Sequence, residues 1–256
     1  MITRRIALAT LAGAFTSIHT ARTFAAEPIR IAFVGDSMAD GVWGGVQRRI
    51  SKNPCLKQTL RTGRFGEIGT GLARADKFNW PAKVKTILTD FKPNLFVVSF
   101  GLNDRNPVVD ISGKNRVDLT APNWTAAYKD QVSAFLQSAA STHASILWLG
   151  IPVLRDDASN KDALEKNIIF KEAINEMKQE RVTYVAPWTL STSGEETFQP
   201  YYTDASGSRV QLRASDGIHF TGAGYDLIAA YVWTKITDHL ERHGGAVSAV
   251  SETGCK

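Results

Sequence analysis

The sequence predicts a three-layer α/β/α domain with a mostly parallel five-stranded sheet. Five β-rich runs alternate with amphipathic stretches along the chain, and this alternation is typical of strands joined by right-handed helical crossovers. Three of the runs are almost continuously hydrophobic, as expected for parallel strands that are covered on both faces. The 256 residues, 43% of them hydrophobic, are enough for one sizeable core.

The expected strands are short runs rich in apolar and β-branched residues, at 29–35, 64–69, 94–101, 145–152 and 182–188. The run "RFGEIG" at 64–69 has the weakest pattern. Helices are expected between and after the strands, at 41–51, 80–90, 124–140, 161–179 and 222–243. The polar segments 104–122 and 189–215 are expected to be loops, and loops of that length in a compact domain are often functional.

The first 26 residues have the pattern of an export signal. A basic "MITRR" precedes the apolar "IALATLAGAFTSI", and "TFAAE" offers small residues for cleavage. We expect cleavage rather than a retained anchor, because the apolar run is short for a span of about 20 residues. Arg4 and Arg5 leave a twin-arginine route open. We therefore expect a bacterial periplasmic or secreted protein with no stable membrane span after signal removal, a domain over 27–245 and a tail over 246–256.

The formal net charge of +5 comes largely from this leader. Arg4, Arg5 and Arg22 are among the 30 Lys+Arg, whereas none of the 25 Asp+Glu lies within 1–26, so 27 basic residues remain against 25 acidic ones. The remaining basic residues form no clustered run of the kind that a nucleic-acid-binding face requires. We expect no nucleic-acid partner.

The sequence contains two cysteines, Cys55 and Cys255. In an oxidising compartment they can form a disulfide that ties the tail to the domain, or they can remain two free thiols, and both alternatives are open. Neither has a histidine at a spacing that indicates a metal site or thiol catalysis. The oligomeric state is open as well.

Polar residues follow two of the expected strands at the edge where a parallel sheet binds ligands. Ser37, in "VGDSMADG", lies at a strand-to-helix turn, where a helix N-terminus favours an anionic intermediate. By itself the segment is more typical of a turn whose Asp36 or Ser37 caps the helix. Asn103, in "GLND", can donate its side-chain amide to an oxyanion, although an isolated Asn after a strand more often forms an Asx turn.

The segment "SDGIHFTGAGY" places Asp216 and His219 three residues apart, just before the last expected helix. At this spacing the carboxylate can accept a hydrogen bond from one imidazole nitrogen, while the other nitrogen faces a serine as a general base. The other four histidines have no comparable partner in the sequence. The residues therefore predict a Ser37, His219 and Asp216 set.

Together these segments resemble blocks I, III and V of the SGNH (GDSL-like) hydrolase superfamily, through "GDSMADG", "GLND" and "DGIHFTGAGY". The segments "GTGLARADKFNWP", "WTAAYKDQV" and "LRASDGIHFT" are similar to a poorly characterised exported bacterial branch of it. The likeness spans about residues 29–240. It implies the flavodoxin-like architecture of SGNH hydrolases and a reaction that needs no metal or cofactor.

The resemblance implies a role for each matching residue. Ser37 would be the nucleophile, His219 the general base and then the general acid, and Asp216 the residue that orients His219. The oxyanion hole would be formed by the backbone N–H groups of Ser37 and Gly71 and by the side chain of Asn103. Block I reads "GDSM" rather than "GDSL", a swap between apolar side chains of similar volume that leaves these roles in place.

Three further positions are less well defined. The second block, within "EIGTGLARADKFNW", offers both Gly69 and Gly71, and we choose Gly71 as the later glycine of the loop. Trp43, six residues after Ser37, is a candidate for stacking on a sugar, although large amphipathic side chains at helix starts more often simply pack. Asp104 is a second candidate for substrate binding because it follows Asn103, although charged loop residues are usually just solvated.

Export and family resemblance together imply a serine esterase that removes short acyl groups, O-acetyl above all, from a carbohydrate or cell-envelope glycan through an acyl-enzyme. The expected partner is an acylated carbohydrate or a small ester. Three alternatives are open: a lipolytic esterase or thioesterase, an O-acetyltransferase acting on a glycan, and a non-catalytic glycan-binding module.

Overall fold

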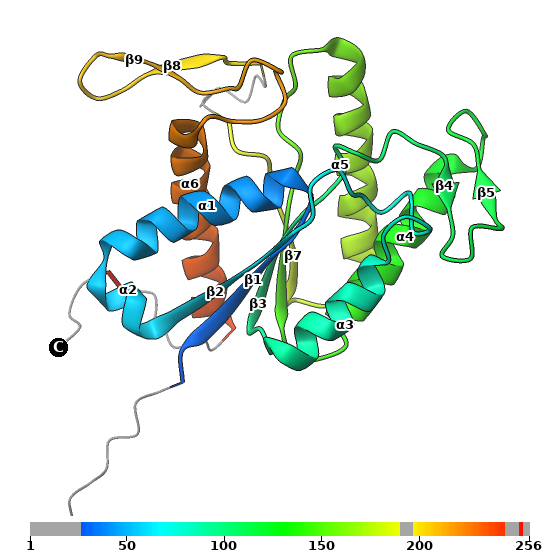
Figure 1. The fold of residues 1–256 in the computed structure, drawn as a ribbon, viewed down its shortest axis with the longest axis horizontal. Helices are drawn as coiled ribbons and strands as arrows, with labels where there is room; N and C mark the ends of the chain where they lie inside the picture. The colour runs from blue at the N-terminus through cyan, green and yellow to red at the C-terminus, as the bar shows by residue number, and fades with distance from the viewer. Residues whose placement is uncertain (1–26, 190–196, 244–250, 253–256) are drawn as a thin grey trace, which may run out of the picture.

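The computed structural model describes residues 27–189, 197–243 and 251–252, so the export signal expected over 1–26 lies outside the described residues. Its centre is a five-stranded sheet in the order β2-β1-β3-β6-β7, and neighbouring strands run parallel (Figure 1). The strands are β1 (Ile29–Gly35), β2 (Leu60–Gly66), β3 (Leu95–Ser99), β6 (Ser145–Leu149) and β7 (Val182–Val185). The predicted fold class is confirmed.

Helices cover both faces of the sheet and complete the three layers (Figure 1). One face carries α1 (Ser37–Lys52), α2 (Pro54–Thr59) and α6 (Gly222–Arg242); the other carries α3 (Trp80–Asp90), α4 (Trp124–Ala139) and α5 (Asp157–Met177). The side chains of successive strand residues point to opposite faces of the sheet. Phe33 packs with α1 and α6, whereas Val34 packs with α3 and α4. Two apolar cores therefore hold the sheet, as the nearly continuous hydrophobic runs require.

The expected starts of α1, β2 and α5 were each wrong by four residues, and α5 begins at Asp157 rather than at residue 161. Helix α1 begins at Ser37 rather than at residue 41, because the Asp36 carboxylate caps it by accepting from the Met38 N–H at 2.9 Å. Strand β2 covers 60–66 rather than 64–69. It is an edge strand with a mixed burial pattern, so its residues lack the continuous hydrophobic signal of the central strands.

The two segments expected to be loops each contain a small antiparallel hairpin. Strands β4 (Val108–Val109) and β5 (Arg116–Val117) pair within the first segment, and β8 (Tyr201–Thr203) and β9 (Arg209–Gln211) pair within the second. Strands of two or three residues are too short to show alternation in the sequence. The β8–β9 hairpin leads directly into the turn before α6.

The sheet order places a topological switch point at the carboxyl ends of β1 and β3. The chain leaves β1 through α1 on one face and enters β3 from α3 on the other face, so the topology switches between these two neighbouring strands. Gly35 pairs with Ser99, and the Asp36 N–H donates to the Ser99 carbonyl at 3.0 Å. Ser37 and Asn103 follow these strand ends and therefore lie at the same edge of the sheet.

Two findings concern the membrane and the cysteines. Within the described ranges, no helix combines the length and hydropathy that crossing a bilayer requires. Cys55, in α2, is disulfide-bonded, which excludes a free thiol at this position. The other cysteine of the sequence, Cys255, lies outside the described residues.

Candidate active site

Ser37 is the first residue of α1 and lies two residues beyond the buried end of β1. The bend before it requires a glycine: Gly35 has φ +146°, and a Cβ there would overlap the Ser99 carbonyl oxygen. The Asp36 cap then turns the chain into the helix. This construction holds the Ser37 hydroxyl at the helix N-terminus, where the helix dipole favours negative charge.

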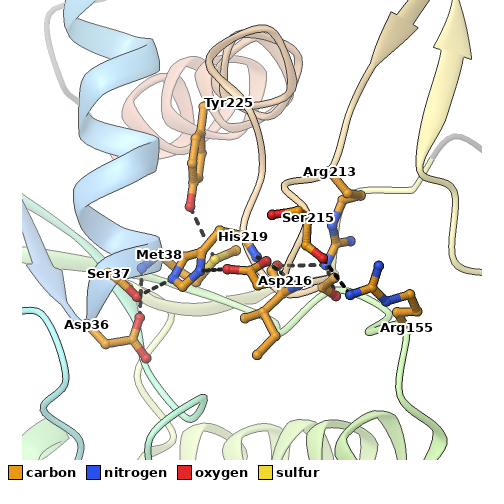
Figure 2. A network of polar contacts seen from close by, with 11 residues as sticks. Asp36, Ser37, Met38, Arg155, Arg213, Ser215, Asp216, His219 and Tyr225 are labelled. Carbon is orange, nitrogen blue, oxygen red and sulfur yellow. Dashed lines mark hydrogen bonds and ion pairs between the residues drawn. The ribbon is translucent and has the colours of Figure 1, made fainter.

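The structure brings Ser37, His219 and Asp216 into one hydrogen-bonded relay (Figure 2). Ser37 Oγ lies 2.7 Å from His219 Nε2, and His219 Nδ1 lies 2.7 Å from Asp216 Oδ2. Asp216 Oδ1 also accepts from the backbone N–H groups of Ile218, at 2.8 Å, and His219, at 3.0 Å. The distances are those of ordinary to short hydrogen bonds throughout.

The ionisation of Asp216 fixes the direction of these hydrogen bonds. Partial burial raises the pKa of Asp216, but the hydrogen bonds from the His219 ring and from the two amides outweigh it and hold the pKa at about 2. The carboxylate is therefore charged at neutral pH and can only accept, so His219 Nδ1 carries a hydrogen. His219 Nε2 is then the acceptor for the Ser37 hydroxyl, which is the arrangement that a general base needs.

The turn that carries Asp216 and His219 is closed at its base by the bridge between Arg213 and Phe220. Inside the turn, the Ala214 N–H donates to the His219 carbonyl at 2.8 Å. Gly217, at the tip, has φ +73°, a conformation that side-chain-bearing residues rarely adopt. His219 is thus held at the end of this turn, directly before Phe220 and three residues before α6 begins at Gly222.

Asn103 presents its side-chain amide at the neighbouring strand end. Asn103 Nδ2 lies 2.9 Å from the Thr70 carbonyl oxygen, which can only accept, so the amide orientation is fixed with the NH2 group toward Thr70. The NH2 group has two hydrogens, and one of them is left to donate elsewhere. This is the property that an oxyanion donor needs.

Gly71 is placed less favourably for the role that we expected. Its N–H belongs to the same peptide as the Thr70 carbonyl, and in a trans peptide these two groups point in opposite directions. Since the carbonyl faces the Asn103 amide, the Gly71 N–H faces away from it. The oxyanion role of Gly71 stays a prediction that this conformation does not favour. Gly69, the alternative, has φ +77° and open space around its Cα.

Asp104 requires a correction, because the structure buries it completely. Its Oδ1 accepts from the Ala73 N–H at 2.8 Å, and its Oδ2 accepts from the Tyr128 hydroxyl at 2.7 Å. A Cβ on Gly71 would overlap the same carboxyl group. Asp104 therefore supports the loop after β2 from inside and is not placed to touch a substrate.

Trp43 lies on α1 facing β2, where it is half-buried. Its indole N–H donates to the Thr62 hydroxyl at 3.2 Å, and the guanidinium of Arg64 lies over its ring at 5.2 Å from the centroid. Arg64 is itself paired with Asp40. One face of the indole is thus already occupied, and stacking of Trp43 on a sugar stays a prediction.

Asp36, directly before Ser37, is a fully buried carboxyl group. Burial raises its pKa from the ordinary 3.8 to about 7, and the nearby Asp104 adds to this, although the amides of Met38 and Leu102 lower it in part. The Leu102 amide is close enough to act on the charge but does not reach hydrogen-bond geometry, since Asp36 Oδ2 has no partner among the described residues. Asp36 thus changes its charge near neutral pH.

Three further residues support the site, and two of them, Thr70 and Arg213, were not identified from the sequence. Thr70 orients the Asn103 amide, and two arginines, Arg155 and Arg213, bond to carbonyls of the turn that carries His219 (Figure 2). Arg213 lies three residues before Asp216 in "LRASDGIHFT", so a basic residue close to the Asp–His pair was the available signal. Its partners are backbone carbonyls, which no residue pattern marks.

The comparisons with known proteins give a family and a fold. The family model described as "Protein of unknown function (DUF459)" matches residues 30–235. Curated protein sequences give no match to this chain.

The solved structures that are similar to this chain include three esterases. The first is an acetyl esterase variant with an acetate ion, with 12% identity, a TM-score of 0.57, and coverage of 84% of this chain and 99% of that one. The second is an acetylxylan esterase from Geobacillus stearothermophilus, solved as a catalytic mutant, with 15% identity, a TM-score of 0.56, and coverage of 90% and 98%. The third is a carbohydrate esterase family 3 protein from Talaromyces cellulolyticus, with 15% identity, a TM-score of 0.50, and coverage of 84% and 99%. These likenesses confirm the SGNH-hydrolase fold that the sequence resemblance implied.

Proposed function

Because the chain belongs to the family described as "Protein of unknown function (DUF459)", we propose its function from its own site: it is a serine esterase that hydrolyses short acyl esters, O-acetyl groups in particular, on a carbohydrate or cell-envelope glycan. The observation that carries this proposal is the relay from Ser37 through His219 to Asp216. A serine whose hydroxyl donates to an oriented, neutral imidazole is an activated nucleophile for acyl transfer.

The first half of the reaction forms an acyl-enzyme. Ser37 Oγ attacks the ester carbonyl carbon while its proton passes to His219 Nε2. The carbonyl oxygen becomes an oxyanion, which the Asn103 amide and the backbone N–H of Ser37 at the start of α1 stabilise. The intermediate then collapses, and the alcohol leaves with the proton from His219. Asp216 stays ionised and stabilises the imidazolium.

The second half releases the acid. A water molecule gives a proton to His219 Nε2 and attacks the acyl carbon. A second oxyanion forms at the same donors, and its collapse breaks the bond to Ser37 Oγ, which recovers the proton from His219. The products are one carboxylic acid and one free hydroxyl group on the sugar, and the enzyme returns to its starting state.

The substrate class is supported by analogy and by the expected export. The solved structures with this fold include an acetyl esterase and an acetylxylan esterase. The export signal predicted over 1–26 would bring the protein to envelope or extracellular glycans. The likeness in fold bears on the acyl group that is removed. The expected export bears on where the glycan lies, and direct measurement of acetate release tests both.

The test combines activity with chemical labelling. Wild-type protein should release acetate from at least one member of a panel of acetylated glycans, should prefer acetyl over longer p-nitrophenyl esters, and should be labelled stoichiometrically by a fluorophosphonate at Ser37. Ser37→Ala should abolish both activity and labelling. Ser51→Ala removes a hydroxyl from the exposed end of the same helix and should change neither.

Each of the other outcomes would indicate a different function for this protein. If Ser37→Ala keeps turnover near that of the wild type, the nucleophile assignment is wrong. Acetylated sugar in place of free acetate would identify an O-acetyltransferase, and a preference for long chains or thioesters would identify a lipolytic enzyme or thioesterase. Saccharide binding without acetate release and without labelling would identify a glycan-binding module.

A further inference from the structure

The turn that carries Asp216 and His219 is filled by a buried cation, the guanidinium of Arg213. Arg213 is only 5% exposed. Its Nη1 donates to the Val153 carbonyl at 2.9 Å, and its Nη2 donates to the Ile218 carbonyl at 2.7 Å and, at 3.4 Å, to the Gly217 carbonyl (Figure 2). One side chain thus binds two consecutive carbonyls between Asp216 and His219 and ties them to the segment that follows β6.

No carboxylate pairs with this cation in the part of the chain that the structure describes. Its Nε is buried without a hydrogen-bond partner there, and its faces contact aromatic rings, with Phe220 at 4.0 Å and Phe198 at 5.0 Å from the ring centroids. Burial lowers the pKa of Arg213 to about 10, so it is still charged at neutral pH. The charge of Asp216 favours the cation without forming an ion pair with it, and simple packing would be served better by an apolar residue than by a buried charge.

The hydrogen bonds within the turn leave three of its carbonyls, those of Ser215, Gly217 and Ile218, to donors from outside it. The turn is irregular, its tip is a glycine with φ +73°, and the side chains of Asp216 and His219 are 44% and 36% exposed. Arg155 assists Arg213 from the neighbouring segment: its Nη2 donates to the Ser215 carbonyl at 2.6 Å, and its backbone N–H donates to the Gly217 carbonyl at 3.2 Å. The carbonyls of Ser215, Gly217 and Ile218 are therefore oriented by Arg155 and Arg213.

We propose that Arg213 is a positioning residue that sets the direction of the His219 imidazole toward Ser37 by fixing the Gly217 and Ile218 carbonyls. It acts through the backbone and does not touch the reacting atoms. The planar fork of a guanidinium can hold several carbonyls at fixed angles, which the point charge of a lysine cannot do. The inference rests on the proposed function for its catalytic consequence, but the geometry that it explains can be measured separately.

The test uses Arg213→Lys, with Arg209→Lys as the matched control. Arg209 lies on β9, four residues before Arg213, in the hairpin that leads into the turn. It is exposed, and its guanidinium stacks on Tyr201. Two readouts are needed: the second-order rate of Ser37 labelling by a fluorophosphonate, and the downfield proton NMR signal of the His219 Nδ1 hydrogen, assigned with His219→Gln. Both are recorded well below the melting temperature and in trimethylamine N-oxide, which favours the folded state.

Arg213→Lys should label about 10- to 100-fold more slowly than the wild type, because a shift of about 1 Å at a catalytic group can cost about 100-fold. The NMR signal should move or broaden, while Arg209→Lys should match the wild type in both measurements. A folded Arg213→Lys protein with wild-type labelling and an unchanged NMR signal would overturn the inference, whatever its loss of thermal stability.

The two proposals can fail separately. If wild-type protein is not labelled at Ser37, the proposed function fails, and the NMR signal alone decides the role of Arg213. If the wild type is labelled and Arg213→Lys matches it in both the labelling rate and the NMR signal, only the positioning role is lost.

Discussion

At the scale of single residues, the site depends on which nitrogen of His219 carries the hydrogen. The ionised Asp216 holds that hydrogen on Nδ1 and leaves Nε2 free to accept from Ser37. Asp216 is itself ionised because three donors of the same short turn point at it. The ionisation of Asp216, and with it the tautomer of His219, is therefore a property of residues 216–219.

Asp216→Asn should lower kcat for p-nitrophenyl acetate by roughly 10³- to 10⁴-fold, because the amide can donate to Nδ1 and so favour the wrong tautomer, and it no longer stabilises the imidazolium. Steady-state kinetics would show the loss in kcat. The control is Asp226→Asn, which neutralises an aspartate paired with Arg48 on the surface of α6 and should stay within about twofold of the wild type. An Asp216→Asn enzyme with a tenth or more of wild-type kcat would contradict the assigned role.

Asp36→Asn should remove a pH dependence of stability. Burial raises the pKa of Asp36 to about 7, so between its ordinary pKa of 3.8 and about 7 the unfolded chain releases this proton while the folded chain keeps it. Stability is thus present at low pH and is lost as the pH rises through this window. Asparagine can keep the cap by accepting from the Met38 N–H.

Urea unfolding at pH 5 and pH 8 measures this effect. Between the two values the free energy of unfolding of the wild type should fall by about 2 to 3 kcal/mol relative to that of Asp36→Asn. Parallel pH profiles for the two proteins would show that Asp36 titrates at its ordinary pKa.

At this scale, the relay could be predicted because Ser37, Asp216 and His219 lie beside element boundaries that the sequence marks. The burial of Asp104 could not be predicted, since its hydroxyl partner, Tyr128, comes from α4. Arg213 was missed for a similar reason: its acceptors are main-chain carbonyls, and every residue has one.

At the scale of elements, α1 shows how closely helices must pack to place Ser37. A Cβ on Gly45 would overlap the Tyr225 carbonyl oxygen and the Ala229 side chain of α6, whereas Gly44, on the neighbouring face, has only the tip of Arg48 within reach. The same glycines lower helix propensity, and they nevertheless lie within α1. Helix α3 was predicted with its observed bounds, Trp80–Asp90.

The two glycines should therefore respond in opposite ways to alanine. Gly44→Ala should raise the free energy of unfolding by about 0.5 to 1 kcal/mol, because alanine is the better helix former. Gly45→Ala should lower it by about 1 to 3 kcal/mol, because α6 must move away. Urea denaturation of both variants measures the difference. Equal shifts of the same sign would show that α1 and α6 are not in close contact at Gly45.

At the scale of the whole molecule, sheet order decides which loops meet. The alternation of strands and helices predicted parallel strands, but it did not give their order, because many orders satisfy the same pattern. The observed order β2-β1-β3-β6-β7 puts β1 beside β3 and so brings the loops of Ser37 and Asn103 together. The sequence blocks that resemble the SGNH superfamily implied indirectly that the loops of Ser37 and Asn103 meet.

The C-terminal part of the chain returns to the corner formed by α1 and α2. Glu252 pairs with Arg49 at 2.6 Å, and its carbonyl accepts from Asn53 Nδ2 at 3.0 Å. Cys55, two residues beyond Asn53, is disulfide-bonded, and the sequence has only one other cysteine, Cys255. These contacts hold Glu252 against α1 and the start of α2, on the face of the sheet opposite α3 and α4.

Loss of the Cys55 disulfide should therefore lower global stability and leave the catalytic relay in place. A disulfide that closes a long loop typically contributes about 2 to 5 kcal/mol, so Cys55→Ser should melt at a lower temperature, and dithiothreitol should lower the melting temperature of the wild type but not that of Cys55→Ser. Fluorophosphonate labelling of Ser37 at 25 °C should be unchanged, because α2 lies at the far end of α1 from the site. A wild-type melting temperature that does not respond to reductant would show that the tail adds nothing to the stability of the domain.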